Sequence, residues 1–220
     1  MIDYPGKLSS IIFLPNCNFR CPYCHNPELV LDAEQLPDIN IDDILRYLKS
    51  KRKWIDGVCI TGGEPTLTPN IDELCRILKS SGFSVKFDTN GTNPQILKEL
   101  IKQKLIDFVA MDIKGPIERY DEIVMVNVNK DNIKESVKII RESGLDYEFR
   151  TTILPKLIKE DDLIAIGKWL KGSKTYVLQQ FRPNITLDKS YGNEVPYTEK
   201  EMKRFGDLLK PYFEKVEVRV

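Results

Sequence analysis

Three of the five cysteines in this sequence lie close together, at Cys17, Cys21 and Cys24. Thiols at this spacing are poor partners for a disulfide framework in a chain of 220 residues, and the total number of cysteines is odd. Three thiolates on one loop can instead bind a soft metal centre, either a zinc ion with an outside ligand or an iron–sulfur cluster. On a cluster of four irons they leave one iron open for a substrate. The residues by themselves leave both metals open.

A zinc ion would need a fourth ligand, for which His25, Cys59 and Cys75 are the candidates. His25 is bonded directly to Cys24 and would struggle to share its metal. Cys59 lies inside a predicted strand, and Cys75 lies on the apolar face of a predicted helix. We expect Cys59 and Cys75 to be buried and to behave as small hydrophobic side chains.

Short β-branched segments alternate with amphipathic segments along the chain. Strands separated by helices imply parallel pairing with right-handed crossovers, in an open doubly wound sheet or in a barrel. A complete eightfold barrel takes ~250 residues, so about six repeats favour an incomplete one. Strands are predicted at 9–14, 57–61, 84–88, 107–112, 147–153 and 175–181, with a last alternating segment at 216–220.

Apolar residues at helical spacing predict the helices between these strands. Asn70 and Glu73 have the spacing of a capping box, and Thr198 is likewise followed by Glu201. Asp131 precedes another helical segment. Helices are predicted at 41–48, 71–78, 96–101, 133–140 and 202–209.

Unusual residues follow four of the predicted strands. The loops that leave the carboxyl ends of parallel strands converge on one face, which is where ligands bind. The cysteine loop follows the first strand, and Gly62-Gly63-Glu64-Pro65 follows the second. Asp88-Thr89-Asn90-Gly91 follows the third strand, and Asp112-Ile113-Lys114-Gly115 follows the fourth. We expect these four segments to meet at one site.

Composition excludes several classes of protein. With 41% apolar and 30% charged residues, the chain can bury a core of its own, which argues against intrinsic disorder. The 33 basic and 33 acidic side chains cancel, so no global positive field attracts nucleic acid. No apolar run reaches the roughly 18–20 residues of a membrane span, and the amino terminus lacks the pattern of a secretory leader. We expect a cytoplasmic protein with no nucleic-acid or membrane partner.

Two motifs together carry a family resemblance. The cysteine loop, Cys17-Asn-Phe-Arg-Cys21-Pro-Tyr23-Cys24, has the CxxxCxxC spacing of the radical S-adenosylmethionine (radical SAM) superfamily, with the aromatic residue that this family prefers before the last cysteine. The GGEP segment at 62–65 resembles the superfamily's second motif. The resemblance covers about residues 9–181 and implies an α/β fold, a partial (β/α)6 parallel barrel. We expect a single domain of residues 1–220, whose carboxyl-terminal helix and strand occupy about 198–220.

Further segments look like the glycyl radical enzyme activases within that superfamily, and most like the anaerobic ribonucleoside-triphosphate reductase activating proteins. This resemblance implies a 4Fe–4S cluster held by Cys17, Cys21 and Cys24, with SAM on the fourth iron. Reductive cleavage of SAM gives methionine and a 5′-deoxyadenosyl radical, which removes a hydrogen atom from a glycine of the partner enzyme. The other two cysteines are too few for a second cluster, so an external donor such as flavodoxin or ferredoxin must supply the electron. The segments are 2–6, 21–27, 88–91 and 112–114.

The resemblance also implies roles for the residues around the cluster. Glycines at the second motif would let backbone carbonyls approach the ammonium group of SAM. Lys114 would reach the carboxylate of SAM, whereas Arg150 would either contact SAM or form a partly buried ion pair. The residues expected to bind SAM are Tyr23, Gly62, Gly63, Asp112, Lys114 and Arg150. Those that resemble a monovalent cation site are Asp88, Thr89 and Asp112, with the backbone carbonyl of Ala110.

Some positions depart from the activases or leave a role open. Where some activases use a histidine on the sixth strand to bind the carboxylate of SAM, this chain offers Gln180 or Arg182. His25, the only histidine, is either a hydrogen-bond donor near the cluster or a partly exposed loop residue. The segment 182–197 reads as an exposed loop that could be a lid or a docking surface.

Two alternatives use the same cysteines differently. A small-molecule radical SAM enzyme, such as the 7-carboxy-7-deazaguanine synthase type, would act on a pterin-like substrate without a protein partner. A zinc-stapled binding module would have no catalysis and would be colourless after anaerobic purification. The segments at 23–27, 88–91 and 112–115 favour the activase.

Overall fold

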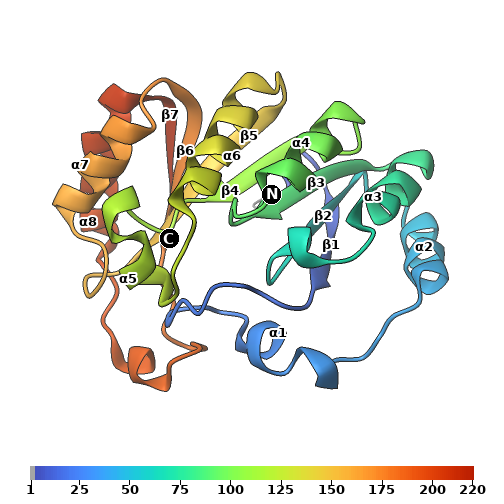
Figure 1. Cartoon of the computed structure of the whole chain (residues 1–220), viewed down its shortest axis with the longest axis horizontal. Helices are drawn as coiled ribbons and strands as arrows, with labels where there is room; N and C mark the ends of the chain where they lie inside the picture. The colour runs from blue at the N-terminus through green and yellow to red at the C-terminus, as the bar shows by residue number, and fades with distance from the viewer. Residues whose placement is uncertain (1–2) are drawn as a thin grey trace.

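The central sheet contains seven strands, and every neighbouring pair is parallel (Figure 1). A computed structural model describes residues 3–220, so Met1 and Ile2 of the predicted domain lie outside the described residues. The order of the strands in the sheet is their order along the chain, which confirms the predicted α/β class. The strands are β1 (Ser9–Leu14), β2 (Gly57–Gly62), β3 (Ser84–Thr89), β4 (Phe108–Asp112), β5 (Asp146–Ile153), β6 (Ser173–Gln180) and β7 (Phe213–Arg219).

The seventh strand extends the six repeats that were predicted. β7 pairs in parallel with β6, with Tyr176 opposite Val216, and it includes most of the alternating segment expected at 216–220. Within residues 3–220, β1 and β7 are the two edges of the sheet and do not pair with each other. The barrel is therefore open, as the partial-barrel prediction requires.

Helices connect successive strands and lie around the sheet (Figure 1). The five predicted helices are confirmed as α2, α3, α4, α6 and α8. Helix α7 was missed because apolar residues follow one another without a gap from Leu163 to Ile166, which obscures the helical period. Helices α1 and α5 were missed because each is little more than one turn. The helices are α1 (Pro27–Leu31), α2 (Ile41–Ser50), α3 (Ile71–Ser80), α4 (Pro94–Lys102), α5 (Tyr120–Val124), α6 (Lys130–Glu142), α7 (Glu160–Trp169) and α8 (Glu199–Leu209).

The helix starts agree only in part with the predicted caps. Thr198 and Glu201 form the expected reciprocal bonds at the start of α8. The capping box expected at Asn70 is wrong, because Asn70 has a left-handed backbone with φ of 55° and its side chain makes no capping bond. Helix α6 begins before Asp131, whose N–H is instead capped by the Asn129 side chain at 3.1 Å.

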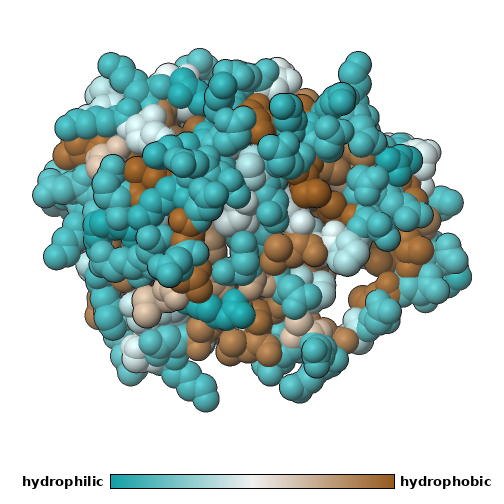
Figure 2. All heavy atoms as spheres, in the orientation of Figure 1, coloured by the Kyte–Doolittle hydropathy of each residue, from teal (hydrophilic) through white to brown (hydrophobic). Residues whose placement is uncertain are grey.

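Burial differs sharply between the inner strands and the first edge strand. Val58, Val85 and Val109 are fully buried in β2, β3 and β4, as expected for a parallel sheet that is covered on both faces. In β1, Phe13 remains 52% exposed. Figure 2 shows openings in one face of the molecule, with hydrophobic atoms along their borders. Among residues 3–220, no helix has the length and apolar character that crossing a membrane would require.

Candidate functional site

A cavity of about 310 Å³ lies where the cysteine loop meets the carboxyl ends of the strands. Side chains from β1 to β7, or from the loops that follow them, line this cavity. It brings together the residues that the sequence suggests for a cluster, for SAM and for a cation, except Gln180, Arg182 and Ala110. These lining residues are Cys17, Cys21, Tyr23, Cys24, Gly62, Gly63, Asp88, Thr89, Asp112, Lys114 and Arg150.

The cysteine loop is held in a compact shape by its own backbone. The N–H of Cys24 donates to the carbonyl of Cys21 at 3.0 Å, and the guanidinium of Arg20 donates to the carbonyl of Cys17 at 2.6 Å. Asn16 has a φ of 70°, which turns the chain from β1 into the loop. Cys21 is buried, whereas Cys17 and Cys24 are partly exposed. The compact cysteine loop therefore presents three thiols to one cavity.

The three loop cysteines line one cavity, and the thiols of Cys17 and Cys24 lie near that of Cys21. Removal from water raises the pKa of Cys17 and raises the pKa of Cys21 to about 12, so both thiols are protonated until a metal binds. In the described part of the chain, no group of three or more His, Cys, Asp or Glu side chains is arranged to hold a single metal ion. The other two cysteines do not join this loop, since Cys59 and Cys75 are buried in β2 and α3 as predicted.

The two glycines of the GGEP segment allow β2 to end directly against the cysteine loop. A Cβ atom on Gly62 would lie 2.2 Å from the carbonyl oxygen of Leu14, and one on Gly63 would lie 1.9 Å from that of Asn16. Gly62 also has a φ of 130°, which side chains disfavour. We expect these glycines to let backbone carbonyls approach the ammonium group of SAM, and the structure adds that a side chain at either position would collide with the protein backbone. Their main structural role is close backbone packing beneath Cys17.

Replacement of Gly63 by alanine is therefore expected to lower iron content and SAM affinity together, because the new methyl group displaces the backbone that leads into Cys17. Iron per chain after anaerobic reconstitution and a SAM titration would measure the two effects. Gly192→Ala is the matched control, since its Cβ would lie no closer than 3.5 Å to any neighbour. Full iron content with weakened SAM binding would contradict this interpretation. It would instead support the expectation that the glycines act on SAM alone.

Glu64 joins the second strand-end segment to the third. Its carboxylate is fully buried and accepts hydrogen bonds from the hydroxyl of Thr66 at 2.6 Å, the hydroxyl of Thr89 at 2.7 Å and the N–H of Asn90 at 2.6 Å. Burial raises the pKa of Glu64, although these donors oppose the shift. Glu64 therefore positions the turns around the cavity, and it is not free to act as an acid or a base.

Replacement of Glu64 by glutamine is expected to lower the free energy of unfolding by roughly 1–3 kcal/mol, because the new amide group faces buried donors that it cannot accept from. Urea denaturation of the protein would measure this loss. Glu73→Gln on the exposed side of α3 is the control, and it should leave the midpoint unchanged. Equal stability of both variants would show that the hydrogen bonds of Glu64 contribute little.

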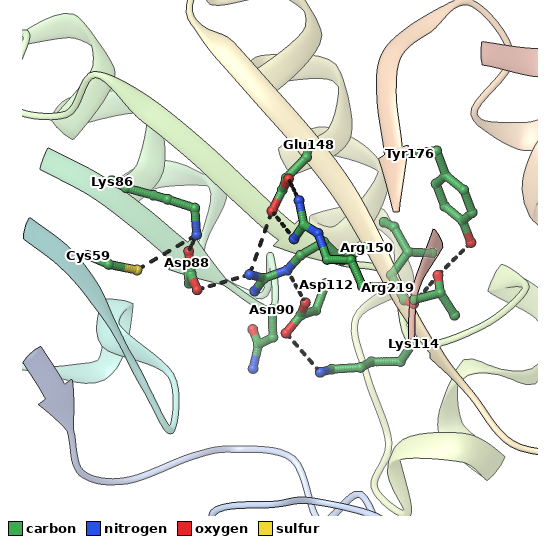
Figure 3. A network of polar contacts seen from close by, with 12 residues as sticks. Cys59, Lys86, Asp88, Asn90, Asp112, Lys114, Glu148, Arg150, Tyr176 and Arg219 are labelled. Atoms are coloured by element: carbon green, nitrogen blue, oxygen red, sulfur yellow. Dashed lines mark hydrogen bonds and ion pairs between the residues drawn. The ribbon is translucent and has the colours of Figure 1, made fainter. Parts of the chain in front are cut away.

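A network of charged side chains crosses the cavity (Figure 3). Arg150 donates from Nε to Asp112 at 2.9 Å and from a terminal nitrogen to Asp88 at 3.1 Å. Lys114 donates to the second oxygen of Asp112 at 3.2 Å. Lys86 donates to the second oxygen of Asp88. Every oxygen of the two carboxylates therefore faces a positively charged group.

These contacts set the charge state of the site. Burial alone would raise the pKa of Asp112, but Arg150 and Lys114 outweigh it and hold this pKa well below its usual range. The same pairing, against the effect of burial, holds the pKa of Lys114 well above its usual range. Of the two roles expected for Arg150, the buried ion pair is present. Arg219 extends the network by pairing with the buried Glu148 at 2.7 Å.

Tyr23 is the one buried polar side chain in the described residues that has no hydrogen-bond partner. Tyr23 is one of the residues that line the cavity, and its buried hydroxyl lies close to Cys21. Buried hydroxyl groups are normally hydrogen-bonded, and an exception calls for an explanation such as a ligand. Tyr23 is therefore placed to donate a hydrogen bond to a molecule in the cavity.

The segment 182–197 docks against the cysteine loop. The N–H of Asp188 donates to the carbonyl of Pro22 at 2.9 Å, and the N–H of Arg182 donates to His25 Nε2 at 3.4 Å. His25 is exposed, stacks on Phe181 with ring centroids 5.7 Å apart, and lines the cavity. The predicted loop is thus a covering segment, and it includes a short 3-10 turn at Lys189–Asn193.

Neither of the two residues proposed on the sixth strand lies on the cavity. The amide nitrogen of Gln180 donates to the carbonyl of Tyr197, and Gln179 lines the cavity in its place. Lys86 was missed as a site residue, although the alternation of a strand places it on the same face as Asp88. A charged residue two positions before another one in a buried strand is the signal that could have found it.

The scan against protein families provides the deciding observation. The model of the Radical SAM superfamily matches residues 11–166, which is most of the chain. The chain belongs to the radical SAM superfamily. It is 38% identical over 223 aligned positions, covering 99% of the chain and 91% of the relative, to the protein of Methanocaldococcus jannaschii named "Putative glycyl-radical enzyme activating enzyme MJ1227". It therefore belongs to the glycyl-radical enzyme activating enzymes within that superfamily.

A second relative and a solved structure resemble this chain in sequence and in fold, respectively. The pyruvate formate-lyase-activating enzyme of Streptococcus mutans is 27% identical over 89% of this chain and 79% of its own length. The crystal structure of SuiB from Streptococcus suis has a TM-score of 0.74 and covers 96% of this chain at 17% identity, which supports the fold alone. This chain spans about half of SuiB, at 49%. Membership of the family implies a 4Fe–4S cluster and SAM as cofactors.

Proposed function

We propose that this radical SAM protein generates a glycyl radical on a partner enzyme, and that anaerobic ribonucleoside-triphosphate reductase is that partner. The observation that carries the proposal is one cavity lined by the three thiols, the GGEP turn and the charged network. The 38% identical relative, named for activation of glycyl-radical enzymes, supports the type of reaction. The choice of reductase rests on the resemblance of the segments at 2–6 and 21–27.

The residues around the cavity fit a cluster with SAM better than they fit a zinc ion. On a four-iron cluster each thiolate binds a different iron, so thiols placed around a cavity suit it, whereas zinc needs ligands that converge. Cys17, Cys21 and Cys24 would hold three irons and leave the fourth for SAM. The unpartnered hydroxyl of Tyr23 suits a polar ligand beside the cluster. When bound, the reduced cluster and SAM supply a 5′-deoxyadenosyl radical that removes a hydrogen atom from glycine.

The protein would position SAM and keep water from it. Lys114 and Arg150 place positive charge on the cavity, where a carboxylate of SAM would be stabilised. Asp112 holds both cations in place through its two oxygens. Gly62 and Gly63 let the second turn pack directly against the cysteine loop, which fixes the position of this turn relative to Cys17. Segment 182–197 covers the outside of the loop.

The electron for this reaction would come from another protein, such as flavodoxin or ferredoxin. The two cysteines outside the loop are Cys59, which is 2% exposed, and Cys75, which is fully buried. They lie on separate elements, β2 and α3, so they offer no ligand set for a second cluster. The cluster would therefore be reduced directly from outside.

The test mixes the anaerobically reconstituted, reduced protein and SAM with the candidate reductase and records the electron paramagnetic resonance spectrum. A glycyl radical doublet that requires both proteins is the expected result. Replacement of the target glycine of the reductase by alanine is the control and should remove the doublet. Absence of any doublet, together with conversion of a pterin-like substrate by this protein alone, would favour the small-molecule alternative instead.

A further inference from the structure

The carboxylates expected to bind a monovalent cation are already neutralised by side chains of this chain. Asp88 receives Lys86 on one oxygen and Arg150, at 3.1 Å, on the other. Asp112 receives Arg150 at 2.9 Å and Lys114 at 3.2 Å. Three cationic groups thus face these two carboxylates in a partly buried network that also includes Glu148 and Arg219 (Figure 3). A metal ion placed here would have to displace an ammonium or a guanidinium group.

Thr89, the third side chain predicted as a cation ligand, is also engaged elsewhere. The hydroxyl of Thr89 donates to Glu64 at 2.7 Å and accepts from the N–H of Gly91 at 3.1 Å. These two bonds hold the turn after β3 together and link it to the GGEP segment. The hydroxyl is therefore part of the support of the cavity, and the residues do not fit a metal cation at this position.

Lys86 is the member of the network that no part of the proposed chemistry requires. It is fully buried in β3, and its Nζ contacts Asp88 and, at 3.7 Å, the sulfur of Cys59. A buried ammonium is costly unless a carboxylate pairs with it, and Asp88 supplies this pairing. Arg150 and Lys114 line the cavity, whereas Lys86 does not and contacts the oxygen of Asp88 that Arg150 leaves free (Figure 3).

We propose that the ammonium group of Lys86 takes the place of a monovalent metal cation, so that the cavity binds SAM without potassium or sodium. The inference rests on the proposed binding of SAM at this cavity. Lys86 neutralises Asp88. The guanidinium of Arg150 can therefore interact both with Asp112 and with the carboxylate of a ligand. Lys86 is thus a positioning residue, which acts through Asp88 and Arg150 and does not touch SAM.

The experiment compares SAM affinity of the reconstituted protein by calorimetry in potassium chloride and in tetramethylammonium chloride at equal ionic strength. The tetramethylammonium ion is too large and too poor a hydrogen-bond donor to replace a buried cation. The wild-type protein is expected to bind SAM with the same dissociation constant, within about twofold, in both salts. A dissociation constant that rises about tenfold in tetramethylammonium and recovers with added potassium would overturn the proposal.

Replacement of Lys86 by methionine should make SAM binding depend on potassium, whereas binding by the wild-type protein should not. Methionine retains much of the buried apolar stem, while Asp88 loses its partner and can recruit a potassium ion in its place. We expect SAM binding by Lys86→Met to weaken about tenfold in tetramethylammonium and to recover in potassium. Lys102→Met, at a lysine whose side chain is 73% exposed, is the control and should behave as wild type. Equal binding by Lys86→Met in both salts would contradict the role of the ammonium group.

A second measurement separates this inference from the proposed function and does not depend on folding of the variant. Crystals of the wild-type protein in rubidium chloride, without SAM, would locate bound rubidium by anomalous diffraction. A rubidium ion between Asp88 and Asp112 would overturn the proposal, and its absence there would support it. If the wild-type protein bound no SAM in either salt, the proposed function would fail, and the rubidium result would still decide whether Lys86 occupies the cation position.

Discussion

Replacement of Cys21 by alanine is expected to abolish both cluster binding and reductive cleavage of SAM. Cys21 is the most buried of the three loop cysteines and its backbone carbonyl closes the turn to Cys24, so no water or neighbouring residue can replace its sulfur. A cluster with two protein ligands in an exposed site is readily lost. Iron and sulfide content, the absorption of the brown chromophore and the amount of 5′-deoxyadenosine would measure the loss.

The matched control for this variant is Cys75→Ala. Cys75 is fully buried on α3, away from the cysteine loop, and serves as a small hydrophobic side chain. Its replacement should reduce stability slightly while the iron content remains at about four per chain. Equal iron content in the Cys21 and Cys75 variants would contradict the assignment of the loop as the cluster site. A colourless wild-type protein with bound zinc would contradict it as well.

Replacement of Arg150 by methionine is expected to have the largest effect on stability. The guanidinium contacts Asp88 and Asp112 and lies 3.8 Å from Glu148, while only 13% of the side chain is exposed. Removal of one partner from a buried charge network leaves the others unpaired, which typically costs about 3–5 kcal/mol. The variant should also fail to bind SAM, because the orientation of the carboxylates is lost. Urea denaturation and a SAM titration would measure both.

Two further variants distinguish the network from a general effect of charge. Arg150→Lys keeps one positive charge but cannot bridge two carboxylates, so its stability should fall between those of wild type and Arg150→Met. Arg141→Met, in α6, removes an arginine whose contact with a backbone carbonyl is exposed, and it should have little effect. An unfolding free energy of Arg150→Met equal to that of wild type would show that the network is not a stabilising unit.

The arrangement of the strands was predictable from local pattern, whereas the contacts inside the barrel were not. Segments such as 57–61 and 84–88 are short and separated by an amphipathic helix, so the number and parallel pairing of the strands follow from period and length alone. The carboxyl ends of parallel strands lie on one face of the sheet. This brings Gly62, Asp88 and Lys114 together without any contact being known. This reasoning identifies the site because topology, rather than side-chain detail, determines it.

The roles of individual residues depend on distances between atoms in the folded protein, which the amino-acid sequence does not contain. The sequence suggests that Gly63 lets backbone carbonyls approach SAM, but it does not reveal that a Cβ atom at this position would collide with the backbone of Asn16. Lys86 was passed over because lysine in a strand is usually exposed, and only tertiary packing shows that it is enclosed. Asn70 had the right residue type for a cap, but its left-handed backbone removes the geometry that a cap needs.

The unpaired edges of the sheet have a consequence for the size of the molecule that the site can accept. Phe13 of β1 and Arg219 of β7 line the same cavity although they come from opposite ends of the sheet. A closed cylinder can be entered only along its axis, which suits a free metabolite. A glycine inside a polypeptide has a segment of chain on each side. Both flanking segments must remain outside the barrel while the glycine itself reaches the reaction centre. A lateral approach between the first and last strands permits this, so an incomplete wall suits a substrate that is itself a folded protein.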